Sequence, residues 1–307
     1  MESKPDIIPT CIICGNTHLK NHFYPPNIFN NKEFRYYSCP DCGSASVSPL
    51  PVKEDYDKIY GVEDHSYLKA MKEGEKIKYD FKWGKYNHRT YQINFFRESC
   101  KLAKGKKLLD YATGSGFYLA YAKELGYEGV GIEYSSEFAA LLKSKSDLNI
   151  VSLQEFKQKY AEQKFDIIHF GHILEHVEKP SELIKQLIAY AHAETIFIVD
   201  GPLENNFCFS ALFIKLGSLL KRKKHNAYPP QHLSFTNYKS QLLVFEKAGL
   251  KKLTYKVVEQ DFPLPDKPQW GSPVSLISFI ISRISIQLSK LHPKAGNVFH
   301  YVGKLNT

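Results

Sequence analysis

The pattern of apolar and polar positions changes character near residue 105. Beyond it, short runs of aliphatic and β-branched residues alternate with longer runs of helical periodicity, which is typical of a parallel sheet covered by helices on both faces. The predicted strands are Lys107–Tyr111, Gly129–Tyr134, Ile150–Ser152, Asp166–Phe170, Thr195–Asp200 and Lys252–Val258. The predicted helices cover residues 117–126, 136–146, 154–161, 180–193 and 236–248. The pattern therefore predicts an α/β fold.

The first 50 residues show little apolar periodicity and are rich in Pro, Asn, Cys and Tyr. A segment of this size has too small a core to fold alone, and a bound metal would supply the missing stability. We therefore expect a small N-terminal module followed by a larger domain. The expected divisions are 1–50 for the module, 51–104 for a linker with leading helices, 105–260 for the main domain with a lid-like insert at 203–230, and 261–307 for a helical extension.

A separate helix is predicted over residues 272–291. Ser272 suits the N-cap and Pro273 the first helical position, and five serines recur three or four positions apart along one stripe. The other faces are apolar, so the helix would pack on the protein or on a second copy in a homodimer. The alternative is peripheral contact with a membrane, through this helix or through residues 207–224. Because no apolar run of about 18 residues and no secretory signal pattern occurs, we expect a soluble, cytoplasmic protein.

Four of the six cysteines form two Cys-x-x-Cys pairs, Cys11 with Cys14 and Cys39 with Cys42, and 24 residues separate the pairs. This spacing is close to that of zinc ribbons, in which two tight turns direct four sulfurs at one ion. Two disulfides or a redox pair are the alternatives, and both are disfavoured in a cytoplasmic chain. We predict a Zn²⁺ site, and because four thiolates close the coordination shell, the metal would be structural.

The first predicted strand of the main domain ends in a loop of small residues that contains Asp110, Ala112, Gly114 and Gly116. Glycines let the backbone approach a nucleoside closely, and the helix that follows offers free amides. Glu133 ends the next strand about 20 residues further on, where a carboxylate can accept both hydroxyls of a ribose. This arrangement occurs in sites for NAD and in sites for S-adenosylmethionine (SAM), so the loop alone predicts a nucleoside cofactor without identifying it.

Two later segments resemble class I SAM-dependent methyltransferases. The sequence FDIIHFGHILEHV at 165–177 is similar to the fourth strand of these enzymes and the loop that lines their methyl-transfer site. The sequence QHLSFT at 231–236, followed by EKAGL at 246–250, is similar to their substrate-side segment. Together with the cysteine pairs, these segments resemble bacterial methyltransferases that join a zinc-binding domain to a SAM domain, including enzymes that act on sugars, glycans and natural products.

The resemblance implies a Rossmann-like methyltransferase sheet, SAM as the methyl donor, and a small-molecule or glycan acceptor such as a nucleotide sugar or a lipid-linked glycan. Ala112 stands where the family most often has its first glycine, and we expect it to keep a negative φ. The expected cofactor-binding residues are Asp110, Ala112, Gly114, Gly116, Glu133, Tyr134, Phe170 and Gly171.

Methyl transfer is an in-line attack on a sulfonium methyl group. The protein must align the acceptor and, for an alcohol or a carbon acid, remove a proton. The candidate bases are His172, Glu175, His176 and His232. His172 directly follows the fourth strand and His232 comes from the segment expected to cover the site, so we predict His172, His232 and His176 as the catalytic residues. A structural histidine with satisfied hydrogen bonds is the alternative for each.

Residues 215–256 contain ten basic residues and one acidic residue, an excess equal to the net charge of +9 of the whole chain. Such a stretch is either a solvated face or a surface that binds anions, and we expect an anionic acceptor or a membrane surface as its partner. The cysteine pairs have nearly neutral surroundings, which disfavours nucleic acid as a partner. An RNA methyltransferase and a SAM-binding protein without catalysis are the alternative functions.

Overall fold

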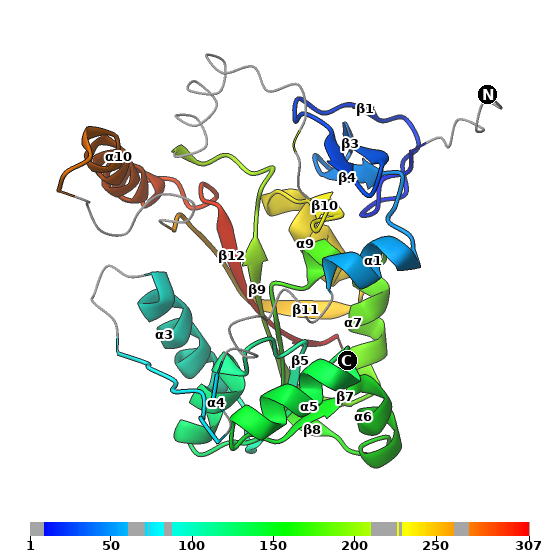
Figure 1. The fold of residues 1–307 in the computed structure, drawn as a ribbon, viewed down its shortest axis with the longest axis vertical. Coiled ribbons are helices and arrows are strands. Elements are labelled where there is room, and N and C mark those ends of the chain that lie inside the picture. The colour runs from blue at the N-terminus through cyan, green and yellow to red at the C-terminus, as the bar shows by residue number, and fades with distance from the viewer. Residues whose placement is uncertain are drawn as a thin grey trace.

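The computed structural model describes residues 9–60, 71–72, 74–82, 88–209, 226, 229–260 and 270–306. Its centre is a seven-stranded sheet with the strand order β11-β12-β9-β8-β5-β6-β7 (Figure 1). Strands β5 to β9 are parallel, whereas β12 runs antiparallel between β9 and β11. This sheet confirms the predicted α/β class. The strand bounds are β5 Lys107–Tyr111, β6 Glu128–Glu133, β7 Ile150–Ser152, β8 Phe165–Gly171, β9 Ala191–Pro202, β11 Leu250–Val258 and β12 Val298–Leu305.

Helices cover both faces of the sheet. Successive residues of a strand point to opposite faces, and Leu108 and Leu109 of β5 accordingly belong to two separate apolar clusters. The cluster of Leu108 includes side chains of α3, α4 and α5, and the cluster of Leu109 includes side chains of α6, α7 and α9. The helices span α3 His88–Cys100, α4 Phe117–Glu124, α5 Ser136–Lys145, α6 Leu153–Lys159, α7 Pro180–Ile188 and α9 Tyr238–Lys247. The carboxyl ends of the parallel strands share one edge of this sheet, where α/β folds bind their ligands.

The sequence pattern does not predict the last strand, and the expected helical extension over 261–307 is wrong for its final residues. Strand β12 pairs Tyr301 with Val199 of β9 on one side and with Tyr255 of β11 on the other. The ring of Tyr301 also stacks on Phe245 of α9, with centroids 3.8 Å apart. The buried polar residue His300 interrupts the apolar run of this strand, and its partner strands lie far away in the sequence. The main domain therefore continues beyond residue 260 and includes β12.

Helix α10 spans Pro273–Ser289 and begins as predicted, because the Ser272 side chain accepts a hydrogen bond from the backbone N–H of Ser275. Its serine stripe is turned toward the protein and its apolar faces are turned outward. The buried serines are Ser282, Ser285 and Ser289. The exposed apolar residues are Val274, Ile277, Ile280 and Ile284.

Contact of α10 with a membrane or with a second copy of the chain stays a prediction. Most of the other expected membrane segment, 207–224, lies outside the described residues. Within the part of the chain that the structure describes, no helix has both the length and the apolar character needed to cross a membrane.

The N-terminal module is a second, antiparallel sheet, drawn in blue in Figure 1. Its strands are β1 Lys20–Asn21, β2 Asn27–Phe29, β3 Lys32–Ser38 and β4 Ala45–Ser48, and helix α1 Lys53–Ile59 follows them. The main domain contributes the edge strand β10, Ser234–Phe235, which pairs with β4. Phe235 stacks on Tyr36 of β3, with ring centroids 4.2 Å apart. The module and the main domain therefore share one sheet.

Candidate active site

The four paired cysteines form one cluster, in which the sulfur atoms lie within 4.8 Å of one another. The Sγ–Sγ distance is 3.6 Å between Cys11 and Cys42 and 3.4 Å between Cys14 and Cys39. Sulfurs about 2.3 Å from a tetrahedral zinc ion are about 3.8 Å apart, so the cluster fits this ion, and the separations are too long for disulfides. The cluster could therefore bind zinc.

Backbone turns and electrostatics both suit a cation in this cluster. Gly15 and Gly43 follow the two pairs with positive φ, and their N–H groups close the turns on Cys11 and Cys39. Hydrogen bonds from Cys42 and Ser44, opposed by burial, lower the pKa of Cys11 to about 3. Burial raises the pKa of Cys14 to about 11. The thiol of Cys11 therefore ionises more readily than that of Cys14, and further thiolates in so small a space would repel one another unless they share a cation.

Polar side chains of the main domain hold the cysteine module in place. Asn205 and Asn237 donate hydrogen bonds to the carbonyl oxygen of Gly43, at 2.8 and 2.9 Å. Lys247 donates to the carbonyl oxygen of Ile13 at 2.9 Å. Asn237 also caps the N-terminus of α9, so the helix and the cysteine turn are fixed by one side chain.

The small-residue loop between β5 and α4 has the open geometry that a cofactor requires. Gly114 and Gly116 both have positive φ, and Gly116 is the N-cap of α4. A Cβ atom on Gly116 would lie 2.8 Å from Leu148, so no larger residue fits there without a shift. A Cβ atom on Gly114 would have no heavy atom within 4 Å, so the space above Gly114 is open.

Ala112 does not keep the negative φ that we expect from the sequence. Its φ is +56°, in the left-handed region. The backbone reverses here so that the Thr113 N–H can donate to the carbonyl oxygen of Ile132 in β6, at 3.0 Å. A residue with a Cβ atom is strained in this region by about 1–2 kcal/mol, so Ala112 takes the conformation of the glycine that it replaces at a cost to stability.

Glu133 ties this loop to the end of β6. Its Oε1 accepts a hydrogen bond of 2.5 Å from the N–H of Gly114. Burial raises the pKa of Glu133 to about 7, although the bond from Gly114 acts in the opposite direction. The next residue, Tyr134, is 85% exposed. An aromatic ring open to solvent therefore follows the Glu133 carboxylate directly in the chain. The predicted pair Glu133 and Tyr134 therefore lies next to the predicted loop.

Asp110 is buried, and both its carboxylate oxygens bind other side chains. Oδ1 lies 2.6 Å from Nδ1 of His169 on β8, and Oδ2 accepts a hydrogen bond of 2.5 Å from the Thr113 hydroxyl. Asp110 thus shapes the loop, and its direct contact with a cofactor stays a prediction. Sequence reasoning missed His169, although its place opposite Asp110 on the neighbouring strand is a signal once the strand register is known.

The remaining two predicted cofactor residues lie at the carboxyl end of β8. The side chain of Phe170 is fully buried in the apolar core, so a cofactor could reach only its backbone. The backbone of Gly171 lies close to the Asp200 side chain of β9, since a Cβ atom on Gly171 would lie 2.4 Å from Oδ1 of Asp200. Of these residues, Tyr134 is exposed and Gly114 and Glu133 are half-buried, whereas Gly116 and Phe170 are buried.

The four candidate bases form a second polar cluster at the same end of β8. Nδ1 of His172 lies 3.8 Å from Glu175 Oε1, and Nε2 of His176 lies 3.7 Å from the same oxygen. The rings of His176 and His232 meet edge to face, with centroids 4.6 Å apart. The structure therefore brings together residues that lie 60 positions apart in the sequence.

The module and helix α1 help to position this cluster. The Tyr36 hydroxyl donates to the carbonyl oxygen of His232 at 2.7 Å. The Tyr60 hydroxyl lies 3.0 Å from Nδ1 of His176. On the other side, Leu233 N–H donates to the carbonyl oxygen of Glu175 at 2.7 Å. Sequence reasoning missed both tyrosines, because nothing in a local pattern shows that residues 36 and 60 fold back onto residues 176 and 232.

The members of the cluster have different protonation tendencies. Burial raises the pKa of Glu175, although His172 and His232 oppose this. Burial lowers the pKa of His176 to about 4. Burial also disfavours the charged form of His232, but the hydrogen bond to Glu204 outweighs it and raises the pKa of His232. The neutral ring is therefore favoured for His176, whereas the hydrogen bond to Glu204 favours the protonated ring of His232.

A further polar group missed by sequence reasoning lies at the end of β9. Asp200 is buried, and its Oδ2 accepts a hydrogen bond of 2.7 Å from the Tyr118 hydroxyl and lies 3.9 Å from Nδ1 of His300. Burial acts to raise the pKa of Asp200, but His172 and His300 outweigh it and lower the pKa. The backbone oxygen of Asp200 also accepts the His172 N–H at 2.9 Å, so Asp200 helps to fix the backbone of His172.

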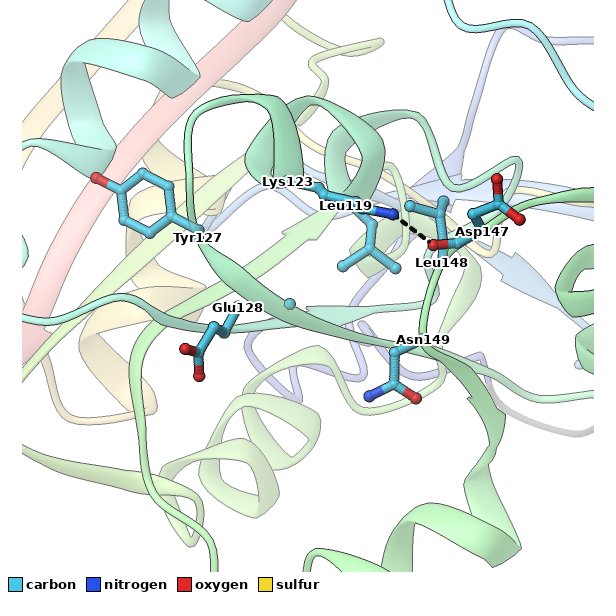
Figure 2. A pocket seen from close by; sticks show the side chains of 8 residues that line it. Leu119, Lys123, Tyr127, Glu128, Asp147, Leu148 and Asn149 are labelled. Carbon is cyan, nitrogen blue, oxygen red and sulfur yellow. Dashed lines mark hydrogen bonds between the residues drawn. The ribbon is translucent and has the colours of Figure 1, made fainter.

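One surface pocket lies at the amino ends of the parallel strands, away from the predicted cofactor loop and the candidate bases. Figure 2 shows it between α4 and the chain before β7, where Lys123 donates to the carbonyl oxygen of Asp147 at 2.8 Å. Glu128 at the start of β6 and Asn149 just before β7 also line it. These positions are the amino ends of parallel strands, opposite the edge at which α/β folds bind ligands. This pocket is therefore not the active site.

The family model described as methyltransferase domain matches residues 84–255, which is more than half of the chain. The chain belongs to this methyltransferase family. It is a SAM-dependent methyltransferase, with an N-terminal four-cysteine cluster joined to the family domain. A comparison with curated proteins finds no match.

Solved structures are similar to this methyltransferase at low sequence identity. A SAM-dependent methyltransferase from Archaeoglobus fulgidus is 15% identical, with a TM-score of 0.46, over 70% of this chain and 93% of that chain. The plantazolicin methyltransferase BpumL is 17% identical, with a TM-score of 0.41, over 83% and 88% of the two chains. The [4+2]-cyclase SpnF is 12% identical, with a TM-score of 0.50, over 83% and 97%. Since SpnF is named a cyclase, the fold alone does not define a reaction.

We predict that Ala112→Gly stabilises the methyltransferase. Glycine adopts the φ of +56° without the Cβ clash, so the free energy of unfolding should rise by about 1 kcal/mol. The measurement is urea denaturation followed by circular dichroism. The matched control is Ala189→Gly at the end of α7, where φ is −58° and the same substitution should destabilise by about 0.5–1 kcal/mol. Equal effects of the two substitutions would contradict the strain at Ala112.

We also predict that binding of S-adenosylhomocysteine weakens as the pH falls from 8 to 6. The ribose hydroxyls would donate to the ionised form of Glu133, and this form is lost as the pH falls through the pKa of about 7. The Kd measured by calorimetry should rise about tenfold between pH 8 and pH 6. Glu133→Gln should bind weakly at both pH values. Glu128→Gln, at the other end of β6, is the control and should behave as the unsubstituted protein, so an equal loss in both variants would count against Glu133.

Proposed function

We propose that this methyltransferase transfers the methyl group of SAM to a small-molecule or glycan acceptor, with His172 as the general base. The observation that carries the proposal is the position of His172, which directly follows β8 and is 48% exposed beside the buried Glu175. A base must be accessible to the acceptor and fixed in direction. The bond from the His172 N–H to Asp200 and the proximity of Glu175 give His172 both properties.

The cofactor would lie across the carboxyl ends of β5 and β6. The backbone of Ala112, Gly114 and Gly116 would approach it closely, and Glu133 would accept the ribose hydroxyls. Tyr134 is exposed and could cover the adenine ring. Asp110 would support this loop through Thr113, and Phe170 and Gly171 would contribute backbone near the methyl group. SAM itself would supply the electrophilic methyl carbon.

His176 and His232 are less suited than His172 to act as the base. In both residues Nδ1 is already hydrogen-bonded to an oxygen of the protein. The partner is the carbonyl oxygen of Gln231 for His176 and Oε1 of Glu204 for His232. His176 is also only 19% exposed. We propose that these two residues orient the acceptor beside His172.

The acceptor remains defined only by class. An anionic acceptor fits the basic stretch 215–256, but Lys221 to Lys224 lie outside the described residues. Two lysines of this stretch bind the cysteine module instead, since Lys239 donates to Asp41 and Lys247 to Ile13. This internal use of basic side chains weakens the alternative of an RNA methyltransferase.

We propose that the cysteine cluster holds a structural Zn²⁺ ion. The four sulfurs fit a closed tetrahedral shell. The module that they would stabilise contributes Tyr36, which binds the backbone of His232. Zinc would therefore act on catalysis through the position of the acceptor segment and would not contact the substrate.

The first test of this function is the variant His172→Asn, which tolerates the φ of +52° at this position. Turnover should fall by about 10²–10⁴-fold without a change in the affinity for S-adenosylhomocysteine, because only the proton acceptor is lost. The assay follows labelled methyl groups from SAM onto nucleotide sugars and lipid-linked glycans.

The matched control is His192→Asn, because His192 lies at the opposite end of the sheet beside Asp166 and should be dispensable. Full turnover of His172→Asn would remove His172 as the base. Salt-dependent binding and methylation of RNA would favour the RNA alternative. Binding of SAM without turnover on any acceptor class would favour a protein without catalysis.

The second test is Cys39→Ser, which removes one zinc ligand. The zinc content measured by mass spectrometry should fall, and turnover should fall by about tenfold or more because the acceptor segment is displaced. The affinity for S-adenosylhomocysteine should not change, since the bonds described for the loop come from β5, β6, β8 and Tyr79 and lie outside the cysteine module. Cys100→Ala, which alters a cysteine outside the cluster, is the control and should keep the zinc. If Cys39→Ser lost affinity for S-adenosylhomocysteine together with zinc, the prediction that zinc acts on the acceptor segment and not on the cofactor loop would be contradicted.

A further inference from the structure

The cluster of candidate bases contains a buried carboxylate oxygen, Oε1 of Glu175, that has no hydrogen-bond partner among the described residues. Glu175 is 7% exposed. Buried carboxylates are normally paired with a cation or coordinate a metal. Two imidazole nitrogens lie near this oxygen, at 3.7 Å for His176 and 3.8 Å for His172. Both distances are too long for direct hydrogen bonds.

The spacing of three donor atoms in the cluster suits a metal ion. One ligand atom from each of Glu175, His176 and His232 lies within 4.8 Å of the other two. Ligand atoms about 2.1 Å from a tetrahedral ion are about 3.4 Å apart. Glu175 Oε1 and His176 Nε2 are 3.7 Å apart, so small side-chain rotations would bring the three atoms to these distances.

The two imidazoles also have the partners that metal-ligating histidines require. Nδ1 of His176 lies 2.9 Å from the carbonyl oxygen of Gln231, and Nδ1 of His232 lies 2.7 Å from Oε1 of Glu204. In the neutral form of each ring, Nδ1 carries the proton that these oxygens accept, and Nε2 keeps a lone pair for a metal ion. In metal sites a carbonyl or carboxylate of this kind fixes the ring of a ligating histidine and increases its basicity.

We propose that Glu175, His176 and His232 bind a divalent transition-metal ion on the acceptor side of the active site. Two imidazoles and one carboxylate suit Zn²⁺, Fe²⁺ or Co²⁺. Three protein ligands leave a position open for an acceptor, unlike the four-cysteine cluster. This proposal deepens the proposed function and rests on it for the identity of the reaction, but binding of the ion is measurable without an acceptor.

Such an ion would prepare an acceptor hydroxyl for methylation. The hydroxyl oxygen would occupy the open position, and the metal would make its proton more acidic. His172, with Nδ1 3.8 Å from Glu175, lies where it can take that proton. The oxygen would then attack the methyl carbon of SAM, the bond from that carbon to sulfur would break, and S-adenosylhomocysteine would leave with both electrons of that bond.

The test is a titration with Co²⁺ of protein that carries one equivalent of zinc, enough for the cysteine cluster alone, followed by absorption spectroscopy. Cobalt held by nitrogen and oxygen gives weak visible d–d bands, whereas cobalt exchanged into the cysteine cluster gives an intense sulfur-to-metal charge-transfer band. We expect one equivalent to bind with d–d bands alone. Glu175→Gln and His232→Ala should each weaken binding by about 100-fold or more, and Glu204→Gln by about 10- to 100-fold.

The matched control is His192→Asn, which alters a partly exposed histidine paired with Asp166 and should leave the Co²⁺ affinity unchanged. The affinity for S-adenosylhomocysteine of each variant shows that it is folded. No Co²⁺ binding apart from exchange at the cysteines, or binding that survives both Glu175→Gln and His232→Ala, would overturn the site. Binding of Co²⁺ by a protein that methylates no acceptor would support the metal site and reject the proposed function, and methylation without Co²⁺ binding would do the reverse.

Discussion

The pairing of strand β10 with strand β4 is the contact on which the proposed acceptor side of this methyltransferase depends. Leu233, just before β10, accepts a hydrogen bond from Val47 of the module and donates one to the carbonyl oxygen of Glu175. His232 is therefore held between the cysteine module and the main domain, with Tyr36 bound to its carbonyl oxygen. The cysteine cluster lies outside the proposed active site. Its folding still affects the position of the His232 ring, because the two backbone hydrogen bonds of Leu233 connect the module to the main domain.

The proposed cofactor side depends on a different interaction, the buried pair of Asp110 and His169 between β5 and β8. Removing one partner of such a pair leaves an uncompensated buried group and is strongly destabilising. The second oxygen of Asp110 binds the Thr113 hydroxyl, directly after Ala112. Bonds on both sides of Ala112 thus hold the loop in its strained conformation, and Glu133 fixes its other end through Gly114.

The sequence predicts local features of this molecule better than distant ones. The strands β5 to β9, the cysteine turns and the start of α10 follow from short patterns, because glycine, proline and serine act on their immediate neighbours. The role of β12, the pair of Asp110 with His169, and the approach of Tyr60 to His176 depend on strand order and on the folding of the module. Ala112 shows the same limit, because its φ follows from a bond to β6 that the local sequence does not reveal.

Backbone strain is concentrated where the proposed chemistry takes place. Among the described residues, four that are not glycine have positive φ: Asn30, Asn31, Ala112 and His172. The two asparagines form the turn between β2 and β3, and asparagine tolerates this conformation. Alanine does not share this tolerance, whereas histidine is enriched in this region as asparagine is, and both Ala112 and His172 follow parallel strands at their carboxyl ends. At His172 the unusual backbone places the N–H on Asp200 and turns the ring toward Glu175. Strain of this kind persists only where the surrounding structure enforces it, and functional sites are where it accumulates, which favours His172 over the other histidines as the residue whose direction the fold controls.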